Sequence, residues 1–147
     1  LGDAYQELKD FARSDENYDK ALEIDPKNAN VLNNYAYYLS VRGERLEKAE
    51  QMSKLSNELE PNQASYEDTY GWIMFRLGRY NDAKEWIGKS LKNSNDNSAT
   101  VLEHYGDVLF KLGDSAGALD YWQRARNAGE GASEFLEKKI LERKYIE

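Results

Sequence analysis

Glycines and other small residues recur along this chain at a nearly constant interval of 34 or 35 residues. Three glycines, each 35 residues from the next, form the clearest column: Gly43, Gly78 and Gly113. Four more columns share the interval: Gly2, Ala36, Gly71 and Gly106; Ser14, Ala49, Ala83 and Ala118; Ala21, Ser56, Ser90 and Ala125; and Pro26 and Pro61. Such a period predicts an array of small units, each packed mainly against its neighbours.

Each unit contains two helical patterns. In the second unit, Leu32, Tyr35, Ala36 and Leu39 follow the i, i+3, i+4, i+7 spacing of an amphipathic helix. A second pattern follows each glycine of the first column, and these glycines are placed to end the first helix in a left-handed conformation. Gly71, in the middle of a first helix, predicts a close approach between the helices of its unit. We therefore expect an all-α array of antiparallel helix pairs.

Several of the repeated residues match a known repeat. The third unit carries Tyr70-Gly71, Leu77-Gly78-Arg79-Tyr80, Ala83 and Leu91, and the first carries Tyr18, Ala21, Leu22 and Asp25-Pro26. In these positions the chain resembles the tetratricopeptide repeat family, over residues 1–131. It departs from the family pattern at Lys9, which replaces a turn glycine, and at Asn95 and Glu130, which replace prolines. The resemblance implies a right-handed α–α superhelix, or solenoid.

The repeats divide the chain into one array over residues 1–147. We expect repeats at about 1–28, 29–63, 64–98 and 99–131, followed by a C-terminal capping helix over 132–147. The first repeat begins partway into its first helix, so we expect the chain to be a fragment of a longer protein. Terminal elements of a solenoid need a polar outer face. We interpret the basic residues near the end as a solvated helix face: Lys138, Lys139, Arg143 and Lys144.

Composition argues against several kinds of site. The 147 residues include no Cys, so disulfides and thiolate zinc sites are excluded, and no apolar run approaches the roughly 18 residues of a membrane span. The balance of 20 Lys and Arg against 27 Asp and Glu gives a net charge of −7, which argues against nucleic-acid binding. The run Asn93–Asn97 lacks the Gly and Glu of a calcium loop. We predict no metal and no cofactor.

The chain offers little for catalysis. His104 is the only histidine, and we interpret it as a helix-face residue beside the groove rather than a general base or a pH switch. Paired carboxylates such as Glu58 and Glu60 are expected by chance among so many acidic residues and are interpreted as solvated. We predict no catalytic residues and do not expect an enzyme.

In tetratricopeptide repeats the first helix of each unit lines a concave surface, so the resemblance implies a groove lined by the first helices of the successive units. Asp3 and Gln6 begin the row. The second unit would contribute Asn30, Asn33, Tyr37 and Ser40; the third, Asp68, Trp72, Phe75 and Arg76; and the fourth, Glu103, Asp107, Phe110 and Lys111.

Two features of this row bear on the partner. Tyr37, Trp72, Phe75 and Phe110 are aromatic residues, which commonly anchor interfaces. For all four the alternative of a place in the core stays open, and for the phenylalanines this means turning toward their own second helices. Acidic residues outnumber basic ones in the row, which favours a neutral or basic partner.

The leading hypothesis is a scaffold or adaptor that binds a peptide or a helix of a partner protein in the groove. The alternative is a structural spacer or a self-association module, forming a homo-oligomer, within a larger cell-envelope protein. The strings Asn33–Leu39 and Asp68–Trp72 resemble C-terminal arrays of bacterial proteins, which indicates a bacterial cytoplasm or, in preference, a periplasm or cell envelope. The carboxylate clamp of the chaperone-binding subtype is not expected, because only Asn34 fits one of its columns and the others hold Thr69, Ser65 and Asp3.

Overall fold

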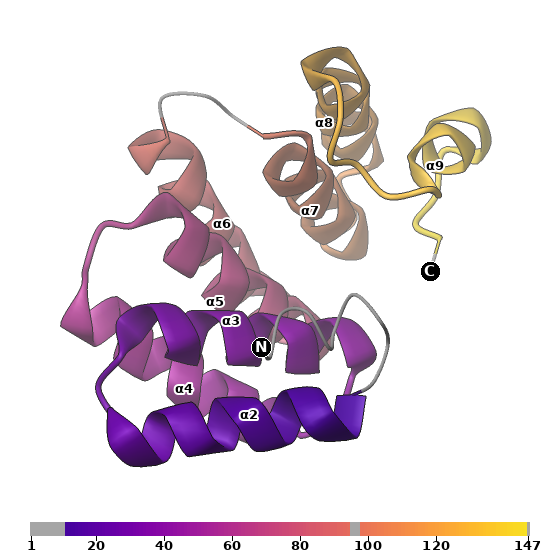
Figure 1. The fold of residues 1–147 in the computed structure, drawn as a ribbon. Helices are drawn as coiled ribbons and strands as arrows, with labels where there is room; N and C mark the ends of the chain where they lie inside the picture. The colour runs from indigo at the N-terminus through magenta and orange to yellow at the C-terminus, as the bar shows by residue number, and fades with distance from the viewer. Residues whose placement is uncertain (1–10, 95–97, 147) are drawn as a thin grey trace.

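A computed structural model describes residues 11–94 and 98–146, and over these residues it consists of helices with no strand (Figure 1). The helices in chain order are α2 (Phe11–Ile24), α3 (Ala29–Arg42), α4 (Leu46–Leu59), α5 (Ala64–Arg76), α6 (Tyr80–Asn93), α7 (Ala99–Lys111), α8 (Ser115–Ala128) and α9 (Leu136–Glu142). The helices α3 and α4, α5 and α6, and α7 and α8 pack as pairs, and the first helices of successive pairs also meet. The predicted all-α superhelix is confirmed.

The glycines of the first column end the first helices as expected. Gly43, Gly78 and Gly113 have φ angles of +70°, +80° and +92°, in the left-handed region where glycine has no steric penalty. In each case the next residue donates its backbone N–H to a carbonyl five residues earlier, which closes the helix end. These bonds run from Glu44 to Leu39 at 3.1 Å, from Arg79 to Met74 at 2.8 Å, and from Asp114 to Leu109 at 2.9 Å.

Three helices begin at a side-chain cap. Asn28 accepts a hydrogen bond from the backbone N–H of Val31, and Ser98 accepts one from Val101. Asp114 accepts the corresponding bond at the start of α8. Each cap satisfies a helix N–H that has no partner within the helix. Three parts of the sequence analysis lie outside the described residues: residues 1–10 of the repeat expected over 1–28, with Asp3 and Gln6; Asn95–Asn97; and Glu147.

Small residues bring the two helices of a pair into backbone contact. A Cβ atom at Gly71 would lie 2.5 Å from Cγ1 of Ile87 and 3.0 Å from its backbone nitrogen on α6. At Gly106 it would lie 2.5 Å from the Trp122 ring on α8. The alanines of the third column, Ala49, Ala83 and Ala118, are fully buried at the same contacts. The spacing between helices is therefore set by the absence of side-chain atoms.

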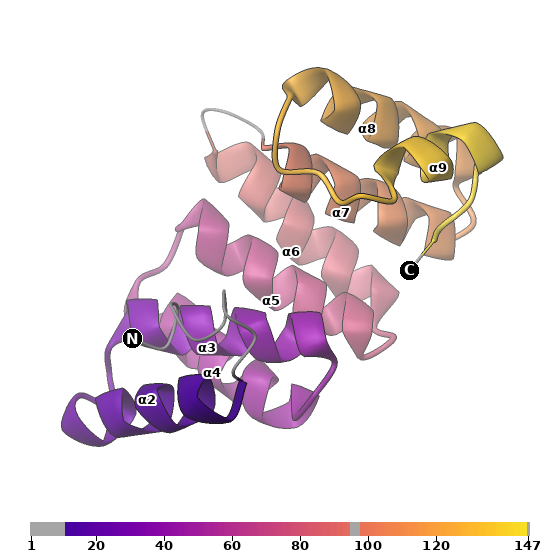
Figure 2. The same cartoon turned by 45° about the vertical axis from the view of Figure 1, so that its right-hand side comes forward.

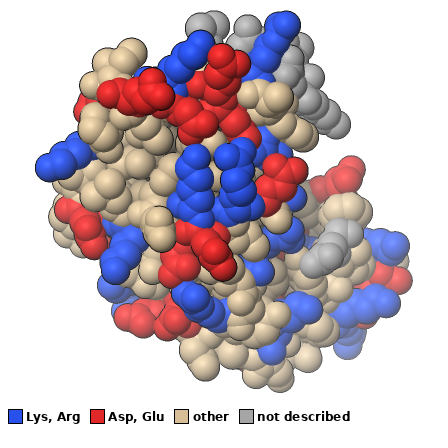
Figure 3. All heavy atoms as spheres, turned by 90° about the horizontal axis from the view of Figure 1, so that it is seen from below, with Lys and Arg blue, Asp and Glu red and all other residues tan. Residues whose placement is uncertain are grey.

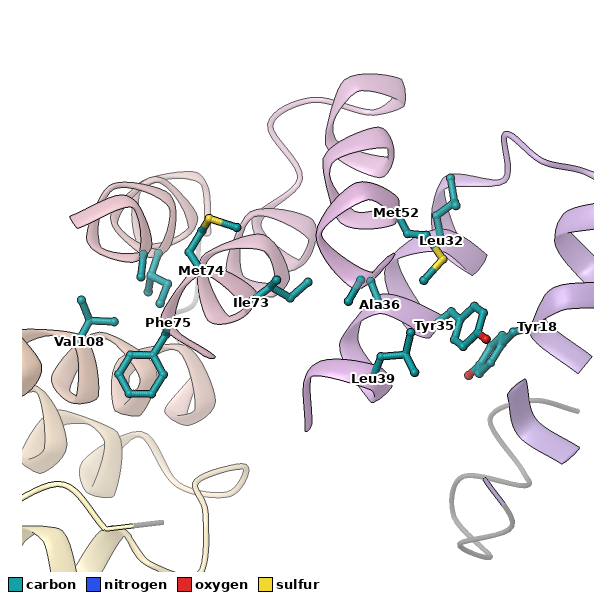
Figure 4. Close-up of a cluster of buried hydrophobic side chains, with 13 residues drawn as sticks. Tyr18, Leu32, Tyr35, Ala36, Leu39, Met52, Ile73, Met74, Phe75 and Val108 are labelled. Carbon is teal, nitrogen blue, oxygen red and sulfur yellow. The ribbon is translucent and has the colours of Figure 1, made fainter. Parts of the chain in front are cut away.

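Two core clusters lie along the array, and the larger one extends from α2 to α7. Figure 4 shows labelled side chains in a continuous row from Tyr18 on α2 to Val108 on α7. The rings of Tyr18 and Tyr35 stack at a centroid distance of 5.0 Å. A second cluster, centred on Trp122, joins α7 and α8 to α9. Each unit thus buries apolar surface against the next, which is the source of stability in a repeat array.

The last helix is shorter than the segment expected for it. It covers Leu136–Glu142 rather than most of 132–147. Leu136 and Ile140 pack against the Trp122 cluster, but Lys139, expected to be solvated, is 3% exposed. Figure 3 shows basic and acidic side chains interspersed on one face of the molecule. No helix in the described residues has both the length and the apolar character needed to cross a membrane.

Replacing Gly71 with alanine is expected to lower the free energy of unfolding by about 1–3 kcal/mol, because the new methyl group overlaps a fully buried Ile87 and the α6 backbone. Gly88→Ala is the matched control. Its Cβ would meet only Tyr105, at 3.9 Å, so the change should stabilise the helix by about 1 kcal/mol. Urea unfolding followed by circular dichroism measures both, and effects of the same sign would contradict the close-contact explanation.

Candidate functional site

A hollow of about 350 Å³ lies on the concave side of the array, where three first helices face the residues that follow α8. We call this hollow the pocket, and residues 131–146 the C-terminal segment. Figure 2 shows the segment crossing α7 before it forms α9. The pocket is lined by Tyr37 and Val41 from α3; Trp72 and Arg76 from α5; Thr100, Glu103, His104 and Asp107 from α7; and Gly131, Ser133, Phe135, Lys139, Tyr145 and Ile146 from the C-terminal segment.

Helical spacing explains which side chains meet here. Tyr37 and Val41 are four residues apart, as are Trp72 and Arg76, so each pair lies on one face of its helix. Of the predicted groove residues, the pocket brings together Tyr37, Trp72, Arg76, Glu103 and Asp107.

The remaining predicted residues lie elsewhere. Asn30 is exposed outside the pocket, Asn33, Ser40 and Asp68 are buried, and Lys111 is exposed beyond it. Phe75 is 5% exposed and contacts Tyr80 on α6, with ring centroids 5.5 Å apart. Phe110 lies 5.9 Å from the ring of Trp122 on α8. Both phenylalanines thus face the second helix of their own pair, as the core alternative describes.

A buried ammonium group fixes the C-terminal segment to α7. Lys139 donates hydrogen bonds from Nζ to Glu103 Oε2 at 2.6 Å and to the two oxygens of Asp107 at 2.9 and 3.1 Å. The side chains of Lys139, Glu103 and Asp107 are 4%, 4% and 1% exposed. Ser133 donates to Glu103 from both its backbone N–H and its hydroxyl, and Trp122 donates from Nε1 to Asp107 at 3.0 Å. We call Glu103, Asp107 and Lys139 the ion cluster.

The pKa values of the two carboxyl groups in the ion cluster are shifted in opposite directions. Burial alone would raise the pKa of Glu103, but hydrogen bonds from Lys139 and Ser133 outweigh it and hold this pKa below its ordinary 4.5. Burial raises the pKa of Asp107 from 3.8 to about 6, against the opposing effect of Lys139. One ammonium therefore faces one firmly ionised carboxylate and one that titrates near pH 6.

His104 joins α7 to α5 beneath the pocket. Its Nδ1 lies 3.1 Å from Asp68 Oδ1, and its ring stacks on Trp72 at a centroid distance of 3.9 Å. Burial by itself lowers the pKa of His104, but the carboxylates of Asp68, Asp107 and Glu103 together raise it above its ordinary 6.5. The imidazole is therefore a structural link whose charge depends on pH.

Arg76 differs from the other charged residues that line the pocket. It is half-buried at the end of α5, and within the described part of the chain its guanidinium has neither an ion pair nor a hydrogen bond. The guanidinium reaches across to the α3–α4 turn, where a Cβ atom at Gly43 would lie 2.7 Å from Nη2. The absence of a side chain at Gly43 leaves room for it.

Lys139 and His104 were not among the predicted site residues, although the repeat carried a signal for both. Glu103 follows Asp68 by 35 residues, and Lys139 follows His104 by 35 residues. The Glu103–Lys139 pair is thus the Asp68–His104 pair moved on by one unit. Reading the columns beyond residue 131 would have placed Lys139 on the buried face of its helix.

Comparison with known proteins gives consistent matches. Family profiles for the tetratricopeptide repeat match residues 1–28 and residues 17–51. Comparison with curated proteins gives no match. Among solved structures, pilF of Pseudomonas aeruginosa is 26% identical with a TM-score of 0.76, over 97% of this chain and 65% of that one. The chain therefore spans less than two-thirds of the length of pilF.

Two further solved structures are similar. YrrB, a TPR protein with an unusual peptide-binding site, is 28% identical over 77% of this chain and 57% of that one, with a TM-score of 0.65. PilW, a widely conserved type IV pilus biogenesis factor, is 20% identical with a TM-score of 0.81, over 97% of this chain and 66% of that one. At this identity the likeness to PilW concerns the fold.

Replacing Lys139 with methionine should lower the free energy of unfolding by about 3–5 kcal/mol, because two buried carboxyl groups lose their cation. The neighbouring Lys138→Met removes the same charge from an exposed position and should change stability by no more than about 0.5 kcal/mol. Urea unfolding of both variants makes the comparison. Equal losses would mean that the ion cluster does not stabilise the fold.

Stability should fall as pH rises above about 6.5. The folded protein holds the His104 proton more tightly than the unfolded chain, so this stabilisation is full below pH 6.5 and is lost as pH passes the raised pKa. The raised pKa of Asp107 acts in the same direction, but between about pH 4 and 6. Urea unfolding at a series of pH values above 6.5 should show that the free energy of unfolding falls more steeply for the parent than for His104→Asn. Parallel curves for the two proteins would contradict the assignment to His104.

Proposed function

The chain belongs to the tetratricopeptide repeat family, and we propose that it is a scaffold that binds an extended segment of a partner protein in the pocket. A role in protein–protein interaction follows from the family and the fold. Proteins of this family are generally scaffolds rather than enzymes. The proposal adds the location of the interaction and the form of the bound segment.

The observation that carries the proposal is the partial exposure of two aromatic side chains in the pocket, Tyr37 and Trp72. Tyr37 and Trp72 remain half-buried in a concave hollow, whereas Tyr35 and Trp122, of the same residue types, are fully buried. Trp72 is held between Phe75, at a ring centroid distance of 4.6 Å, and His104, at 3.9 Å. A ring that is already immobile loses little entropy on binding, so it is well suited to anchor a partner side chain.

The dimensions of the pocket favour an extended segment over a helix. Its 350 Å³ is at the lower end of the range for ligand pockets and suits a few side chains. The C-terminal segment, fixed to α7 through Lys139, occupies the adjacent part of the concave surface. The open part therefore lies over α3 and α5.

The comparisons support this proposal from outside the structure. YrrB, at 28% identity, has a peptide-binding site, and pilF comes from a bacterium. These likenesses agree with a peptide-binding scaffold of bacterial origin.

Random peptides selected on the parent protein from a display library provide the test. Synthetic copies of the selected peptides should bind Tyr37→Ala about thirtyfold more weakly, the loss expected for an aromatic anchor. Trp86→Ala is the matched control, because Trp86 is also half-buried but lies on α6, outside the pocket. Fluorescence anisotropy measures the affinities.

Equal losses of peptide affinity in Tyr37→Ala and Trp86→Ala would mean that the binding surface lies outside the pocket. Failure to select any peptide, together with a mass that rises with concentration in light scattering, would favour the self-association alternative.

A further inference from the structure

We propose that the segment bound in the pocket is acidic, and that Arg76 holds one of its side-chain carboxylates while a neighbouring apolar side chain packs on Trp72. The inference rests on the proposed function and specifies the chemistry of the partner. It reverses the preference for a neutral or basic partner that the acidic row of residues predicted. The expected partner changes because the carboxylates of the row are already paired within the chain.

The carboxylates of the row are engaged within the chain. Glu103 and Asp107 are bound by Lys139, and each accepts a further hydrogen bond from Ser133 or Trp122. Asp68, predicted in the same row, lies against His104 and is 7% exposed. The ion cluster carries two carboxyl groups and one ammonium, but its surplus negative charge is buried and its oxygens are occupied. A partner cation would have to displace Lys139 to reach them.

Arg76 is in the opposite situation. Its guanidinium lines the pocket and is half-buried, and within the described residues it has no acidic partner. A guanidinium offers two parallel N–H donors to one carboxylate, and partial removal from water strengthens such a pair. The guanidinium lies beside Gly43, where the absence of a side chain leaves room for it. Within the described residues, the structure thus presents a half-buried cation with no anion paired to it.

Trp72 is placed to contact the apolar side chain next to the bound carboxylate. Trp72 precedes Arg76 by four residues, so the indole and the guanidinium lie on the same face of α5, one turn apart. Tyr37 faces the same pocket from α3. A carboxylate and an adjacent apolar side chain of one extended segment can therefore meet both groups at once.

The place of α5 in the array favours a side-chain carboxylate over a chain terminus. Among the first helices that line the pocket, α5 lies between α3 and α7, so a segment following the row passes Arg76 partway along its length. The contact at Arg76 is then made by an Asp or Glu within the segment.

The test uses peptides selected on the parent protein from a random display library. The selected peptides should share an Asp or Glu next to an aromatic or aliphatic residue. For the tightest peptide, replacing that Glu with Gln should weaken binding to the parent by about tenfold or more, the loss expected for a charge-assisted hydrogen bond. The same peptide change should have almost no effect on Arg76→Gln, because the two changes remove one contact.

Lys84→Gln is the matched protein control, since it removes one positive charge from an exposed position on α6. It should bind the parent peptide and the Gln peptide with the same ratio as the parent protein does. Circular dichroism establishes that each variant is folded. The peptide change on the parent needs no protein variant, so the proposal can be tested even if Arg76→Gln is unstable.

Each result supports or overturns the proposal. A shared acidic residue whose effect disappears in Arg76→Gln supports it. Peptides whose affinity falls in Tyr37→Ala bind in the pocket. If such peptides contain no acidic residue, or bind Arg76→Gln as tightly as the parent, they overturn this inference and leave the proposed function standing. Binding that depends on a free C-terminal carboxylate, lost on amidation, overturns the side-chain assignment. If no peptide is selected, the proposed function itself fails, and this inference fails with it.

Discussion

The contact between α7 and α8 at Gly106 determines the position of the groups that line the C-terminal half of the pocket. Because Gly106 has no side chain, the Trp122 ring lies against the α7 backbone, where a Cβ atom would be only 2.5 Å away. From there the indole N–H reaches Asp107, and Asp107 in turn binds Lys139. Through Lys139, the C-terminal segment is bound to α7. The close contact between the Trp122 ring and the α7 backbone thus helps to position one wall of the pocket.

Much of this architecture could be predicted from the sequence because the chain repeats. The column glycines specified the helix ends, and Gly71 specified the close approach of α5 and α6. The concave surface was inferred by carrying the columns over from the family. Five of the residues expected to line the groove meet in one pocket for this reason. A periodic fold places equivalent positions in equivalent surroundings, so few long-range contacts had to be inferred.

The charges of the pocket could not be inferred in the same way. Counting Asp and Glu along the row treated each as a solvated group, whereas Glu103 and Asp107 are buried and share a lysine more than thirty residues away. The assignment of Phe75 and Phe110 to the core likewise depended on side-chain direction, which the column of a residue does not specify. Arg76 was in the predicted row, but its lack of an ion pair within the described part of the chain emerges only when the other charges have been paired.

The dependence of the pocket on the C-terminal segment has a thermodynamic consequence. The segment contains one short helix and is held at the end of the array by Lys139, by Ser133 and by the packing of Leu136, so local opening at this end costs less than unfolding of the whole array. When the segment detaches, the pocket loses one of its walls. Affinity for a ligand in the pocket therefore includes the free energy of keeping the segment in place. By linkage, an occupied pocket must shift the local folding equilibrium of the segment toward the closed form.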